Sequence, residues 1–359
     1  MMLRCGIVGL PNVGKSTLFN AITQSAKAQA ENYPFCTIEP NSALVAVPDD
    51  RLDKLAKAAG SQKIIPAYIE FVDIAGLVEG ASKGSGLGNK FLSHIREVDI
   101  IVHVVRCFED KDVVHVRGEI NPLYDLEIIE TELILADLES VEKRLAKKAK
   151  NMDLDTTKLL ESILPLLQNG KLAKEIISSE NKEKVKQLQL LTTKPFMYVC
   201  NVAEGDVTSG NNWSEKVFEL AKNGYAPCHL ISAKIEAEIS QLTSEEEKKE
   251  FLGMIGLEES GISQIIKFCY RTLGLGCYFT IGPKEAHSWT FKRGILSPSA
   301  AGIIHSDFER GFISAEVISW EDYLKYPNEA KMKEQGKMRL EGKEYEVADG
   351  DVINFRFNV

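Results

Sequence analysis

The chain has 359 residues, 44% of them hydrophobic and 26% charged, which is the composition of a globular protein with two or three domains. Its formal net charge of −9 excludes a polycation, so a nucleic-acid partner would have to meet a local basic surface. Its seven cysteines are scattered and contain no Cys-x-x-Cys pair. This pattern excludes a recognisable zinc site or disulfide framework and favours a reducing compartment.

The sequence offers no segment for membrane insertion or export. No apolar stretch approaches membrane-spanning length, and the first predicted strand begins so close to the N-terminus that we expect no signal peptide. We therefore predict a cytoplasmic protein with no membrane partner. Nothing in the pattern implies an obligate oligomer.

Residues 9–17 read Gly-Leu-Pro-Asn-Val-Gly-Lys-Ser-Thr and lie between an apolar run at 3–8 and a helical pattern that begins after them. Strand, Gly-x4-Gly-Lys-Ser and helix form a phosphate-binding loop, whose backbone N–H groups and helix N-terminus hold an anion. Lys15 is expected to reach the β- and γ-phosphates, and the Ser16 hydroxyl to ligate Mg²⁺. The predicted nucleotide-binding residues of this loop are Asn12, Val13, Gly14, Lys15, Ser16 and Thr17.

Residues 1–127 alternate strand-like and helical patterns. Apolar runs predict strands at 3–8, 43–47, 68–72 and 100–105. Such alternation is typical of a mostly parallel sheet covered on both faces. Two further buried strands, at 196–200 and 228–231, follow after a long gap.

The gap at 128–194 predicts an inserted antiparallel helical hairpin. Ile134, Leu138, Val141 and Leu145 recur at helical spacing, and a polar break at 151–155 separates them from a second apolar series. The stretch also holds a basic cluster, which is either a solvated helix face or a contact to RNA phosphates: Lys143, Arg144, Lys147, Lys148 and Lys150.

Beyond residue 276 the pattern changes to a small α+β domain. It predicts strands at 277–281, 286–291, 315–320 and 352–357, with helices at 299–304 and 329–337. The predicted organisation is therefore a P-loop domain over 1–127 and 195–275, the helical insertion over 128–194, and a C-terminal domain over 276–359.

Asp73 directly follows the predicted strand at 68–72 and opens the sequence Asp-Ile-Ala-Gly. Asp-x-x-Gly in this position is typical of GTPase-like proteins, where the aspartate holds a Mg²⁺-bound water and the Gly76 N–H meets the γ-phosphate. Thr37 could complete the metal shell when the γ-phosphate holds its loop in place. The predicted metal ligands are thus Ser16, Thr37 and Asp73.

Base recognition is expected at 201–204, which reads Asn-Val-Ala-Glu after a strand. GTP-binding relatives carry Asn-Lys-x-Asp here, and their aspartate accepts two hydrogen bonds from guanine. In this chain Val202 replaces the lysine and Glu204 the aspartate, so the misplaced carboxylate disfavours guanine and the pattern favours ATP. Asp206 remains as an off-register substitute, and Ser232 opens a Ser-Ala-Lys loop that packs on the base.

The chain resembles the Obg-like ATPases, also called YchF proteins, which are P-loop proteins of the translation-factor class. The resemblance runs the full length and is carried by the strings at 9–17, 32–41, 71–78, 84–89, 201–204 and 350–355. It implies an α/β fold with a Ras-like ATPase core, a coiled-coil insertion and a C-terminal TGS domain of β-grasp fold. It also implies preference for ATP over GTP, slow hydrolysis, and association with ribosomes.

The family also suggests how water is activated. Leu77 stands where Ras-like enzymes place a glutamine, so another group must orient the attacking water. The resemblance points to His115 as a catalytic residue in addition to Lys15. A histidine on an apolar stretch is also typical of core packing. His94 and His103 are expected to be structural. Asn12 matches relatives that place a monovalent cation near the phosphates, which leaves K⁺ beside Mg²⁺ as a second cofactor to consider.

Two other functions compete with an ATPase. One is a true GTPase of ribosome assembly, and the other is a nucleotide-gated binding module with negligible turnover. Leu77 gives weight to the second of these, because its side chain cannot position water.

Overall fold

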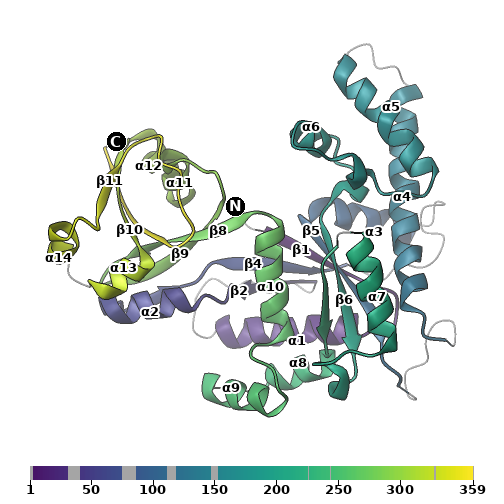
Figure 1. The fold of residues 1–359 in the computed structure, drawn as a ribbon, viewed down its shortest axis with the longest axis horizontal. Coiled ribbons are helices and arrows are strands. Elements are labelled where there is room, and N and C mark those ends of the chain that lie inside the picture. Colours follow the sequence, from purple (N-terminus) through teal and green to yellow (C-terminus); the bar gives the residue numbers. More distant parts are fainter. Residues whose placement is uncertain are drawn as a thin grey trace.

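A computed structural model describes residues 3–30, 41–74, 86–110, 119–146, 153–224, 226–242, 244–326 and 329–358. Within these ranges the chain forms two six-stranded sheets and a helical arm. The arm, built by α4 and α5, projects from the first sheet on the side away from the second sheet (Figure 1). The expected mixed α/β architecture is therefore confirmed.

The first sheet has the strand order β2-β4-β1-β5-β6-β7, and each strand is parallel to its neighbours except β2, which is antiparallel to β4. Apolar sequence explains its central position, since every residue of β5 is buried. The carboxyl ends of the parallel strands share one edge, where ligands bind in open α/β sheets. The strands are β1 (Leu3–Val8), β2 (Ser42–Ala46), β4 (Tyr68–Asp73), β5 (Ile100–Cys107), β6 (Phe196–Val202) and β7 (Cys228–Ile231).

Helices pack against this sheet and bury its apolar side chains. The first of them, α1, contacts β1, β2 and β4, whereas α4 contacts β5 and α7 contacts β6 and β7. The helices of the domain are α1 (Lys15–Ala30), α3 (Gly86–Glu97), α7 (Asn212–Asn223), α8 (Ala233–Ile239), α9 (Glu245–Met254) and α10 (Gly261–Thr272). None of the helices in the described ranges combines the length and apolarity needed to cross a bilayer.

The predicted helical hairpin is confirmed as α4 (Pro122–Ala146) and α5 (Leu154–Gln168), which pack together along an apolar seam that includes Val141 and Leu160. The chain returns to the sheet through η2 (Ala173–Ile176), α6 (Lys182–Gln187) and η3 (Leu191–Thr193). Asp137 fixes this return, because its buried carboxylate accepts backbone N–H bonds from Leu191 at 2.9 Å and Thr192 at 2.7 Å.

The described residues include two members of the basic cluster, Lys143 and Arg144. Arg144 donates to the Leu188 carbonyl at 3.0 Å, and Lys143 pairs with Glu139 one turn earlier. Residues 147, 148 and 150 lie outside the described residues. A contact of this cluster to RNA phosphates therefore stays a prediction.

The second sheet has the order β11-β10-β12-β8-β9-β3, with α11 packed on β9 and β10. The predicted strand at 315–320 was wrong at its end, because the Ser319 hydroxyl caps α13 and Trp320 begins that helix. The short elements β11, α12 and α13 were not predicted. The elements are β8 (Leu275–Ile281), β9 (Glu285–Lys292), α11 (Ser297–Ile304), α12 (Ser306–Arg310), β10 (Phe312–Ser319), α13 (Trp320–Lys325), α14 (Glu329–Glu334), β11 (Arg339–Glu341) and β12 (Asp351–Phe357).

A segment from the N-terminal part of the chain completes the second sheet. Strand β3 (Lys63–Ile65) pairs in parallel with β9, and α2 (Asp50–Ala59) contacts β8, β9 and α13. Arg51 reinforces the joint, since it binds Asp349 at 3.2 Å and its guanidinium lies 5.3 Å from the centre of the Phe279 ring. The sequence pattern predicts a P-loop domain over the whole of 1–127 and does not indicate that α2 and β3 pack with the C-terminal strands.

Leu55 on α2 tests whether this segment is part of the second domain's core. The side chain is 0% exposed and belongs to the same apolar cluster as Phe279 and Ala286. We predict that Leu55→Ala lowers the free energy of unfolding by about 2–5 kcal/mol, as expected for a buried leucine. Urea denaturation would measure this loss, and hydrogen exchange would locate the weakened amides in β8 and β9.

Leu154→Ala serves as the matched control, because Leu154 is 69% exposed and its removal should cost less than about 0.5 kcal/mol. Equal effects of the two substitutions would show that α2 is not part of a shared core.

Candidate functional site

The phosphate-binding loop connects β1 to α1 at the carboxyl edge of the first sheet. Gly9 has no space for a side chain, because a Cβ there would lie 2.7 Å from the Val104 carbonyl oxygen of β5. Gly14 has φ of +90° and a Cβ added to it would collide with the Asn201 amide. Asn12 also adopts a left-handed conformation, with φ of 64°. The loop therefore requires its glycines and turns directly into the N-terminus of α1.

Lys15 and Asp73 meet at this edge. The Lys15 ammonium forms an ion pair with Asp73 Oδ1, and the Lys15 residue is 8% exposed. The parallel register of β1 and β4 pairs Ile7 with Asp73, which brings the predicted metal ligand beside the loop. The structure thus places two predicted phosphate- and metal-binding groups in direct contact.

Asn201, at the end of β6, joins the two halves of the site. Its Nδ2 donates to the Val13 carbonyl at 2.9 Å, and its Oδ1 accepts from the Ala233 N–H at 2.9 Å. The residue is 4% exposed, so both hydrogen bonds lie in a dry environment. Asn201 therefore ties the phosphate-binding loop to the Ser-Ala-Lys loop.

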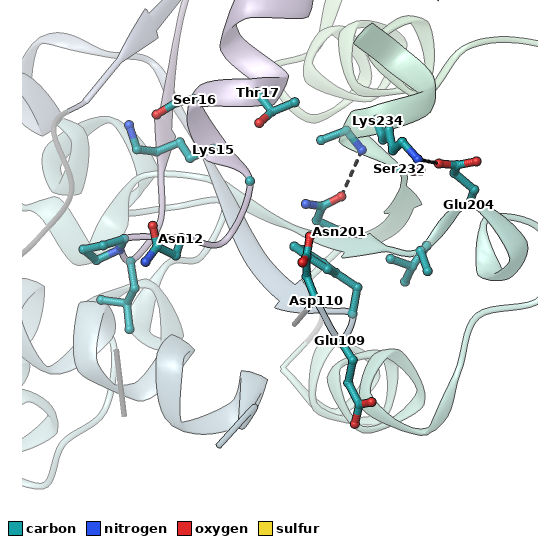
Figure 2. Close-up of a pocket in the computed structure, with 17 residues that line it drawn as sticks. Asn12, Lys15, Ser16, Thr17, Glu109, Asp110, Asn201, Glu204, Ser232 and Lys234 are labelled. Carbon is teal, nitrogen blue, oxygen red and sulfur yellow. Dashed lines mark hydrogen bonds and ion pairs between the residues drawn. The ribbon is translucent and has the colours of Figure 1, made fainter. Parts of the chain in front are cut away.

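Beyond Asn201, Val202 and Glu204 line the side of the site where the base is expected. Figure 2 shows the Glu204 carboxylate turned toward Lys234, with which it forms an ion pair. The hydrogen bond within this ion pair raises the pKa of Lys234 above its ordinary value. The carboxylate that replaces the guanine-binding aspartate is therefore already engaged with a cation.

Asp206 was the alternative acceptor for guanine, and the structure gives it another partner. Asp206 Oδ2 accepts a 2.8 Å hydrogen bond from Asn211 Nδ2, and the same amide donates to the Cys107 carbonyl at 2.8 Å. Asn211 also caps α7. Asp206 is thus part of the packing between β5, β6 and α7, and it does not line the pocket.

A pocket of about 790 Å³ runs along this edge, which is within the usual size range of a small-molecule site. Figure 2 shows its lining residues. The predicted residues that line it are Asn12, Gly14, Lys15, Ser16, Thr17, Asn201, Val202, Glu204 and Ser232. Val13 is buried and contributes its carbonyl to Asn201 instead.

Three predicted site residues, Thr37, Gly76 and His115, lie outside the described residues, and their roles stay predictions. His103 on β5 is 3% exposed, and burial lowers its pKa to about 3, as expected of a neutral core residue. His94 lies on an exposed face of α3 rather than in the core.

Arg106, which is not among the predicted site residues, contacts two residues that line the pocket, Asn12 and Phe108. Its side chain is among the largest that are fully buried, and it donates to the Phe108 carbonyl at 3.1 Å and the Asn12 carbonyl at 3.4 Å. Its guanidinium also lies 4.7 Å from the centre of the Phe108 ring, which lines the pocket. The available signal was a lone arginine inside the apolar run at 100–107, a place where charge needs a specific partner.

Helix α8 carries the Ser-Ala-Lys loop and is itself held by a buried carboxylate. Glu236 accepts the Gly261 N–H at 2.7 Å, at the N-terminus of α10. Burial raises the Glu236 pKa to about 7, although the backbone hydrogen bonds act in the opposite direction. The hydrogen bond between Glu236 and Gly261 joins α8, which lies at the base side of the pocket, to α10.

A strand, a glycine loop ending in Lys15 at a helix N-terminus, and Asp73 at the end of the neighbouring strand define a P-loop nucleotide-binding protein. Comparison with known families agrees. A family model described as 50S ribosome-binding GTPase matches residues 4–135, and a YchF-GTPase C-terminal model described as a protein of unknown function matches residues 275–358.

Curated relatives match over the full length. Proteins named ribosome-binding ATPase YchF are 54% identical in Bacillus subtilis and 50% identical in Escherichia coli O157:H7, and each alignment covers 100% of both chains. A solved structure of the Schizosaccharomyces pombe YchF GTPase is 37% identical, covers 99% of this chain and 97% of that chain, and superposes with a TM-score of 0.88. The chain belongs to the YchF family.

The collision at Gly14 gives a direct test of the site. We predict that Gly14→Ala weakens ATP binding at least about 100-fold, because the new Cβ meets the Asn201 amide in a backbone conformation that alanine resists. Isothermal titration calorimetry with Mg²⁺ and ATP would measure the loss.

Gly205→Ala is the control, since a Cβ at this position has open space and Gly205 follows Glu204 beside the same pocket. Its affinity should stay within about twofold of the unmodified protein. Undiminished binding by the Gly14 variant would contradict the site described above.

Proposed function

We propose that this protein binds ATP in preference to GTP, hydrolyses it slowly, and acts on the ribosome as a nucleotide-controlled switch. The relatives named ribosome-binding ATPase YchF support the activity and the partner. The geometry of the pocket supports the choice of purine, and a cytoplasmic location follows from the proposed partner.

The base end of the pocket carries the argument for ATP. A guanine base needs an anionic or carbonyl acceptor for its N1–H and N2 amine. Glu204 is paired with Lys234, and Asp206 is bound to Asn211. Adenine presents an N1 acceptor and an N6 donor, which the backbone around Val202 is proposed to satisfy. Guanine would have to leave its donors unpaired, at a cost of about 1–3 kcal/mol, or compete with these partners for the carboxylates.

The phosphate end fits a magnesium–nucleotide complex. Ser16 and Lys15 line the pocket, and the Asp73 carboxylate forms an ion pair with Lys15. Hydroxyl and carboxylate oxygens are the donors that Mg²⁺ prefers, and nucleotide phosphates and waters usually fill its other positions. Bound Mg²⁺ would neutralise charge on the phosphates. Lys15 must leave Asp73 to reach the phosphates, so nucleotide binding exchanges one ion pair for another.

Slow turnover is proposed from the chain's own residues. Leu77, which cannot hydrogen-bond through its side chain, holds the position of the water-orienting glutamine in Ras-like enzymes. His115 is the proposed alternative, and a ribosomal group is another. Asn12, which adopts a left-handed conformation in the loop, is the proposed neighbour of K⁺.

Single-turnover hydrolysis tests this function. Radiolabelled ATP or GTP is mixed with excess protein and Mg²⁺, with and without ribosomes, and Lys15→Ala serves as the inactive control. We predict slow ATP cleavage, faster cleavage with ribosomes, and at least tenfold weaker GTP binding in competition. Lys15→Ala should bind neither nucleotide measurably, because it lacks the ammonium that holds the phosphates.

Two outcomes would overturn the proposal. Tighter binding of GTP than ATP would indicate a GTPase. ATP binding with no cleavage in either arm would indicate a nucleotide-gated binding module.

A further inference from the structure

We propose that Lys234 is a specificity-determining residue of the nucleotide pocket, because its ion pair keeps the Glu204 carboxylate from accepting hydrogen bonds from guanine. The inference rests on the proposed preference for ATP and names the residue that enforces it.

The two side chains come from different loops at the base end of the pocket. Glu204 follows β6 and begins a short 3₁₀ turn, whereas Lys234 lies in the first turn of α8. Both line the pocket, and their charged ends meet at its rim (Figure 2). The loops that carry them are held in register, since Asn201 Oδ1 accepts from the Ala233 N–H.

Exposure shows that Glu204 could move if Lys234 did not hold it. The Glu204 side chain is 46% exposed, and hydrogen bonds from the protein to its carboxylate are found only at Lys234 among the described contacts. A glutamate has enough rotatable bonds to swing its carboxylate across the pocket rim. Loss of the cation at Lys234 would then leave this carboxylate free to accept from guanine.

Other carboxylates surround Lys234 and must be separated from Glu204 in the test. Asp110, which lines the pocket, and Glu238, one turn along α8, also act electrostatically on Lys234. Neither forms a described ion pair with it. The inference therefore assigns the effect of Lys234 to its contact with Glu204 and not to these two carboxylates.

The test measures dissociation constants for non-hydrolysable ATP and GTP analogues with Mg²⁺ by calorimetry. Lys234→Met removes the charge but keeps an unbranched apolar stem that can still pack on a base. We expect its GTP affinity to rise on the order of tenfold relative to its ATP affinity, because a free carboxylate forms charge-assisted hydrogen bonds with guanine. Lys234→Arg keeps the cation and should retain the ratio of the unmodified protein.

A double substitution assigns the effect to Glu204. Lys234→Met combined with Glu204→Gln should return to the original ratio, since the amide carries no charge. Lys234→Met combined with Asp110→Asn should keep the shifted ratio. An unchanged ratio in Lys234→Met, or a shift that persists without the Glu204 carboxylate, would overturn the inference.

Failure of the proposed function looks different. If the unmodified protein binds neither analogue, or prefers GTP while Lys234 is intact, the preference for ATP itself is wrong. The Lys234 inference is instead overturned by variant ratios measured against a background that does prefer ATP.

Discussion

The buried amide of Asn201 is the contact on which the nucleotide site depends. It bonds the phosphate-binding loop through Val13 and the base-side loop through Ala233, and both partners are backbone groups. Such groups are costly to leave unpaired in a dry interior. Asn201 therefore sets the distance between the place that holds phosphates and the place that holds the base. The glycine at position 14 is required because this amide occupies the adjacent space.

The second constraint is that the two sheets share a segment of chain. Strand β3 ends at Ile65 inside the second sheet, and β4 begins at Tyr68 inside the first. The segment of chain that leads to Asp73 thus passes from the second sheet, in β3, directly to the first sheet, in β4. The C-terminal family model covers 275–358, whereas the second sheet and its packed helices also include α2 and β3. The strand that ends in Asp73 is for this reason covalently continuous with a strand of the second sheet.

The sequence located residues of the candidate site wherever their pattern is local. The loop at 9–17, Asp73, and the exchange of Asp for Glu204 are all read from short motifs at strand ends, and the parallel sheet brings these ends together. The contact of Arg106 with the Asn12 carbonyl and that of Lys234 with Glu204 could not be read in this way, because the partners are distant in sequence. The pairing of β3 with β9 was missed for the same reason, since a three-residue strand has little periodicity of its own.

The most direct test of the account is the affinity of Asn201→Asp for ATP with Mg²⁺, measured by calorimetry on material shown to be folded. Aspartate matches asparagine in shape and keeps an acceptor for the Ala233 N–H, but it replaces the donor to the Val13 carbonyl with a negative oxygen. The account predicts an affinity at least about tenfold weaker than that of the unmodified protein. An affinity equal to it would show that the two loops are held together without this amide and would contradict the account.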